Sequence, residues 1–300
     1  MARLLTNDKL TVEYGKRFAT RPYKGRTGVS PTIGFEFEIP LNAQELYERG
    51  YLDYPDEAYD PDYFNECPLD APRSVPMSQQ WLADRGFKTH LECGGQEVCS
   101  PIHLQIEQAR ATARGLLDTA YKTWWLEPDA APDDGRFCGI HVHAGTRLTY
   151  QLNENFNSFV FAIMNRRSAS RFIWALSGRT SGTEYAGQAE SDEWDTQGDN
   201  AWLEHNAMVQ SNGADGDYTL EYRFFAGLAD RLIPAIDFTH SFTKWARPLW
   251  ERSDLTDVDL FREGSMHWGR EIPTVQMYKK WLDKQPGYAA LKSDNALSYI

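Results

Sequence analysis

The stretch GFEFEIP, residues 34–40, alternates apolar and acidic residues with a period of two. A β-strand turns successive side chains to opposite faces, so Glu36 and Glu38 share one face and the phenylalanines between them share the other. The strand predicted over residues 33–40 ends at its proline, which cannot donate to the ladder of a sheet. An acidic pair is common on an exposed strand, but inside a sheet it is self-repelling unless a cation binds.

Two later segments repeat this two-residue spacing. The sequence CGIHVHAG begins at residue 138 and places His141 and His143 on one strand face, and LEYRFF begins at residue 220 and does the same for Glu221 and Arg223. The residues between them are apolar and are expected in the core. A sheet face that carries carboxylates, imidazoles and a guanidinium is typical of a metal and phosphate site.

The remaining periodicities predict an α+β domain. Further strands are expected at 88–92, 96–100, 138–144 and 218–225, and helices at 103–126, 152–176 and 230–252. The first two of these strands form a hairpin across Gly94-Gly95, and Glu97 lies in the second, on the same face as Cys99. Short paired strands separated by long helices predict a mainly antiparallel sheet, with helices on one face and a cleft on the other.

The chain divides into three parts. Residues 1–32 form an N-terminal arm with seven Lys or Arg against two acidic residues, residues 33–252 form the main domain, and residues 253–300 form a helical extension. Two segments of the main domain are expected to be loops. One is an insertion over 51–76, rich in Pro, Asp and Tyr, and the other spans 178–217 and begins with a Gly-, Ser- and acid-rich run.

Bulk properties narrow the classes of function. The net charge of −12 over 300 residues argues against a nucleic-acid or anionic-membrane binder, because both need a basic surface. No segment has the length and apolarity of a signal peptide or a membrane span. The four cysteines, Cys67, Cys93, Cys99 and Cys138, show no CxxC spacing. We expect a soluble, cytoplasmic protein.

The residues alone are compatible with two kinds of metal site. His141 and His143 with a glutamate would make a zinc site, which Cys138 could complete, and this predicts a zinc-dependent hydrolase. Glutamates gathered with an arginine fit Mg²⁺ and a nucleotide phosphate equally well. The chain has no phosphate-cradling glycine loop of the G-x-x-x-x-G-K-[ST] kind, so side chains such as Arg167 and Arg223 would have to hold the phosphates.

The motifs G-F-E-F-E, E-V-C-S-P, C-G-I-H-V-H-A-G and L-E-Y-R-F-F-A-G, in this order over roughly residues 33–230, resemble the amidoligase family. This family belongs to the carboxylate–amine ligases related to glutamine synthetase and glutamate–cysteine ligase. The resemblance implies a curved antiparallel sheet whose concave face forms the active site. It also implies ATP and Mg²⁺, and a small-molecule or peptide carboxylate joined to an amine donor through an acyl phosphate.

The resemblance also implies a division of labour among the residues. It implies that Glu36, Glu38 and Glu221 are metal ligands. Glu97 would be a further metal ligand or the carboxylate on the side of the amine substrate. His141 lies near metal and phosphate. Arg223 binds the transferring phosphate, and His143 matches the motif without a defined role. Apart from the resemblance, we expect His143 and Arg167, which projects from the helix over 152–176, at the nucleotide site. A catalytically inactive relative that only binds ligands is the alternative from another class of protein.

Overall fold

The computed structural model describes residues 30–40, 82–92, 95–121, 139–164, 166–178, 209–212, 218–253 and 273–300. The arm over 1–32, except for its last three residues, and the whole insertion over 51–76 lie outside the described residues, as does Cys138. Only 178 and 209–212 are described from the loop predicted over 178–217, and the side chain of Arg167 is not described.

An antiparallel sheet organises the described residues. Its six strands have the order β2-β3-β1-β4-β6-β5, and every neighbouring pair is antiparallel. The strands are β1 Thr32–Pro40, β2 Lys88–Glu92, β3 Gly95–Cys99, β4 Gly139–Gly145, β5 Val209–Asn212 and β6 Thr219–Ala226. The predicted α+β class and the antiparallel pairing are therefore confirmed.

The short edge strand β5 corrects the loop prediction. Its sequence, VQSN, contains one apolar residue and gives no strand signal of its own. Two contacts hold it in place: it pairs with β6, with Gln210 opposite Glu221, and Asn153 donates a hydrogen bond of 2.6 Å to the hydroxyl of Ser211. The strand is therefore set by tertiary contacts.

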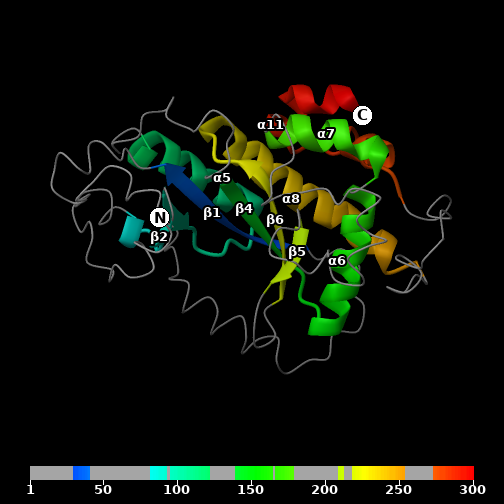
Figure 1. The fold of residues 1–300 in the computed structure, drawn as a ribbon, viewed down its shortest axis with the longest axis horizontal. Helices are drawn as coiled ribbons and strands as arrows, with labels where there is room; N and C mark the ends of the chain where they lie inside the picture. Colours follow the sequence, from blue (N-terminus) through cyan, green and yellow to red (C-terminus); the bar gives the residue numbers. More distant parts are fainter. Residues whose placement is uncertain are drawn as a thin grey trace.

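Helices cover one face of the sheet (Figure 1). They are α5 Ile106–Gly115, α6 Tyr150–Met164, α7 Arg167–Ser177 and α8 Ala229–Trp250. The sheet residues that pack in this core are apolar and fully buried, namely Ile33, Phe35, Phe37, Val98, Ile140, Val142, Leu220, Tyr222 and Phe224. These are the residues that alternate with the polar pairs, so the predicted assignment of faces holds.

Two predicted helices have different bounds in the structure. The helix expected from 103 begins three residues later, at Ile106, because His103 forms a β-bridge with Ile33. It continues as a π-helical turn over Leu116–Tyr121. The helix expected over 152–176 is two helices, since Arg166 has an extended backbone, with ψ of 138°, between α6 and α7.

The C-terminal segment packs on α8. Its helices α10 Val275–Leu282 and α11 Ala289–Ser293 are followed by a 3₁₀ turn over Asn295–Tyr299. Buried polar side chains of α8 form hydrogen bonds with this segment. Ser241 Oγ lies 2.6 Å from the Tyr278 hydroxyl, and the ring of His240 is hydrogen-bonded to the same segment. The described part of the predicted extension over 253–300 therefore contains two short helices and a 3₁₀ turn.

Among the described helices, none combines the length and apolarity that crossing a lipid bilayer requires.

Candidate metal and phosphate site

Strand register gathers the polar residues on the face opposite the helices. Glu36 of β1 lies directly across from His141 of β4, and His143 of β4 lies across from Glu221 of β6. On the other side of β1, Glu38 faces Glu97 of β3. Two carboxylates directly opposite each other destabilise a sheet unless something positive lies between them.

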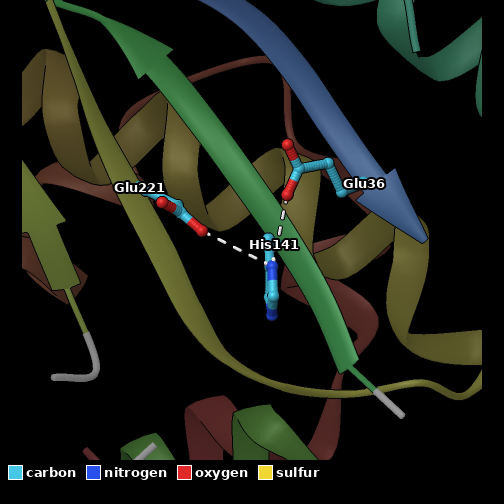
Figure 2. A group of neighbouring side chains, drawn as sticks. All are labelled: Glu36, His141 and Glu221. Carbon is cyan, nitrogen blue, oxygen red and sulfur yellow. Dashed lines mark hydrogen bonds and ion pairs between the residues drawn. The ribbon is translucent and has the colours of Figure 1, made fainter. Parts of the chain in front are cut away.

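His141 lies at the centre of the cluster. Its Nδ1 is 3.2 Å from Glu36 Oε2 and 3.4 Å from Glu221 Oε1, and Figure 2 shows the ring between these two carboxylates. Its Nε2 is 3.5 Å from Glu38 Oε1. The potential ligand atoms of Glu36, His141 and Glu221 all lie within 4.8 Å of one another, which is close enough to hold one metal ion.

A second group of potential ligands shares Glu36 with the first. Glu36, Glu97 and Cys99 also bring one ligand atom each within 4.8 Å. The Cys99 thiol donates to Glu97 Oε1 over 3.1 Å. Glu38 belongs to neither group, and its Oε2 accepts a hydrogen bond from the backbone N–H of Gly139.

A β-bulge lies beside His141. The pairing of β4 with β6 shifts by one residue between Ile140 and Val142. Two residues of β6, Arg223 and Phe224, therefore lie opposite the single residue His141 of β4 in the ladder. Such a bulge bends its strand and changes where the side chains point, and bulges are frequent next to active sites. Arg223 stays on the polar face with a side chain 10% exposed, and its Nη1 is 3.1 Å from Glu221 Oε1.

The charges of the cluster stabilise one another. Burial raises the pKa of Glu36, but the charge of His143 and hydrogen bonds from His141 and His143 bring that pKa well below its usual value. Burial likewise opposes ionisation of Glu221, yet His143, Arg223 and His141 lower its pKa.

The two histidines show the converse effect. Burial alone would lower the pKa of His143, but Glu36, Glu221 and Glu97 raise it to about 9. The pKa of His141 is also raised, against burial, by its hydrogen bond to Glu36 and by the charges of Glu38 and Glu221. The raised pKa values favour protonated histidines beside the carboxylates, and a metal ion that takes His141 as a ligand would displace the proton of that ring.

The oxygen atoms of Glu221 have separate partners. Gln210 Nε2 and Asn212 Nδ2 of β5 donate to Oε2 over 2.8 and 2.7 Å, while Oε1 faces His141 and Arg223. We did not predict these two amides, because they lie within the predicted loop over 178–217. Their two-residue spacing is the same as in the other pairs, but it indicates a shared face only once the segment is known to be a strand.

The structure brings together nearly all the predicted site residues, namely Glu36, Glu38, Glu97, His141, His143, Glu221 and Arg223. Arg167 stays untested, because its side chain lies outside the described residues; its helix α7 packs against α8 and the C-terminal 3₁₀ turn. No group of converging ligand atoms among the described residues contains both histidines.

No family model matches this chain, and no curated protein is significantly similar to it. The resemblance to amidoligases therefore rests on the four motifs.

Proposed function

We propose that this protein is an ATP-dependent carboxylate–amine ligase that works with Mg²⁺ on a glutamine synthetase-like sheet. The observation that carries the proposal is the convergence of Glu36, His141 and Glu221 within 4.8 Å, with Arg223 bonded to Glu221. A carboxylate-rich ion site with an adjoining guanidinium is what a triphosphate needs when no glycine loop cradles it. The donor set suits Mg²⁺ or Mn²⁺ through its carboxylates, with one imidazole.

The reaction has two displacements. A carboxylate oxygen of the first substrate attacks the γ-phosphorus of ATP, the bond to the β-phosphate oxygen breaks, and ADP leaves. The neutral amine of the second substrate then attacks the acyl carbon, the bond to phosphate breaks, and an amide and inorganic phosphate form. A proton leaves the amine nitrogen in this second step.

The residues divide these tasks. Glu36, Glu221 and His141 would hold Mg²⁺, which would supply positive charge to screen the triphosphate. Arg223 neutralises charge on the transferring phosphoryl group, for which its planar fork is suited. Glu97 binds the incoming ammonium group or accepts its proton, because only the neutral amine attacks. His143, which is an ion-pair partner of Glu36, fixes that carboxylate over an Nε2–Oε1 distance of 3.0 Å.

The decisive experiment measures ADP release from ATP–Mg²⁺ across a panel of carboxylates and amines. The panel should favour cationic amines, because the protein carries a net charge of −12. Release that requires both a carboxylate and an amine, and that is lost in Glu36→Ala, supports the proposal. Tightly bound zinc without nucleotide affinity would indicate a hydrolase instead, and no binding of ATP–Mg²⁺ in calorimetry would indicate an inactive relative.

A further inference from the structure

The edge strand β5 contacts the site through one oxygen atom of Glu221. Gln210 Nε2 lies 2.8 Å and Asn212 Nδ2 lies 2.7 Å from Oε2 of this carboxylate, whose residue is only 2% exposed. Two donors on one oxygen hold the carboxylate against rotation about its terminal bond. They also satisfy a charge that would be costly to bury without partners.

The other oxygen is thereby directed into the cluster. Oε1 of Glu221 lies 3.4 Å from His141 Nδ1 and 3.1 Å from Arg223 Nη1. A quarter-turn of the carboxylate would separate Oε1 from both partners. The amides of β5 therefore fix the orientation of the carboxylate, so that its second oxygen atom points at His141 and Arg223.

The strand that carries these amides is anchored from its other side. Asn153 of α6 donates to the hydroxyl of Ser211 over 2.6 Å and to the backbone carbonyl of Thr219 over 3.0 Å. Because Ser211 lies between Gln210 and Asn212 in the strand, the helix holds one face of β5 while the two amides face Glu221.

We propose that Gln210 and Asn212 are positioning residues that set the metal affinity of the site through Glu221. This inference rests on the proposed function for the identity of the site, and it adds a role for the edge strand that the motifs do not contain. Residues that orient a metal ligand contribute about 10–100-fold in metal affinity or activity when they are removed.

The test is a calorimetric titration of the protein with Mn²⁺ alone. Gln210→Met and Asn212→Leu keep the approximate side-chain shape and remove the donors, and each should weaken Mn²⁺ binding by about 10-fold or more. Gln108→Leu, which removes an exposed amide on α5, should bind as the wild type does. A thermal melt of each variant shows whether the protein tested is folded, and either of the two β5 variants tests the inference if the other does not fold.

Turnover separates positioning from a general defect. The metal concentration for half-maximal ADP release should rise in Gln210→Met, and turnover at saturating Mn²⁺ should recover most of its wild-type value. Unchanged Mn²⁺ affinity in folded variants would overturn the inference and leave the proposed function standing. Absence of Mn²⁺ binding by the wild type would overturn both.

Discussion

Glu36 on β1 and His141 on β4 are direct cross-strand neighbours, and Glu36 Oε2 lies 3.2 Å from His141 Nδ1. The two residues are separated by more than a hundred positions in the chain, and the sheet register alone brings them together. Glu36 belongs to both groups of converging ligand atoms, so its carboxylate is the residue on which the proposed ion site depends most.

Replacing Glu36 by Gln tests this dependence. The amide keeps the shape of the side chain but removes its charge, and we expect Mn²⁺ affinity to fall by more than about 100-fold, beyond the effect of residues that only orient a ligand. Calorimetry measures the change. Glu107→Gln on α5, whose carboxylate is 73% exposed, should leave affinity unchanged. Equal affinities in the two variants would place the ion elsewhere.

Arg223 should affect turnover without supplying a metal ligand. We expect Arg223→Ala to lower the rate of ADP release by about 100-fold or more, because charge on the transferring phosphoryl group is no longer neutralised. Mn²⁺ affinity should not fall, since removing a neighbouring positive charge takes away no ligand. Arg223→Lys should recover only part of the rate, because an ammonium group lacks the planar fork.

The matched control for this series is Arg171→Ala, which removes an exposed arginine on α7. A loss of Mn²⁺ affinity in Arg223→Ala as large as the loss of turnover would show that Arg223 acts by holding Glu221. The separate role in phosphate binding would then be wrong.

The sequence predicted the two faces of the sheet because side chains alternate along a strand. Phe35 and Phe37 lie in the core and Glu36 faces the site, and this follows from the period of two. The alignment of Glu36 with His141 could not be read in this way, since register depends on contacts between strands. The resemblance to the amidoligase family predicted that Glu36 and His141 lie in one site, and the structure gives the distance between them.

Two features of the site have no local signal. Strand β5 contains a single apolar residue, Val209, and is fixed by its pairing with β6 and by Asn153. The bulge at Arg223 and Phe224 interrupts a segment whose alternation of apolar and polar residues predicts a regular strand. Its effect appears in the packing, where both Phe224 and the next residue are buried with their rings 4.2 Å apart.

The core beneath the site should be sensitive to truncation at Phe238. This residue of α8 is fully buried, and its ring packs against Phe242 and Tyr278 with centroids 4.9 and 5.8 Å away. We expect Phe238→Ala to lower the free energy of unfolding by about 3–5 kcal/mol. Met277→Ala, at a side chain 48% exposed, should change it by less than about 1 kcal/mol. Urea denaturation monitored by circular dichroism measures both.

His143 should make the stability of the metal-free protein depend on pH. Its pKa is raised to about 9 by Glu36, Glu221 and Glu97, against an ordinary value of about 6.5. The folded state therefore binds this proton more tightly than the unfolded state does. The resulting stabilisation is fully present below about pH 6.5 and is lost as pH rises through about 9.

The comparison of the wild type with His143→Gln isolates this effect, because other groups titrate in both proteins. In the presence of a chelator, the wild type should exceed the variant in free energy of unfolding by the largest margin near pH 6. The margin should shrink by at most about 1.4 kcal/mol per pH unit between about pH 6.5 and 9. Urea titrations at several pH values measure it, and parallel pH curves would show that His143 does not carry the raised pKa.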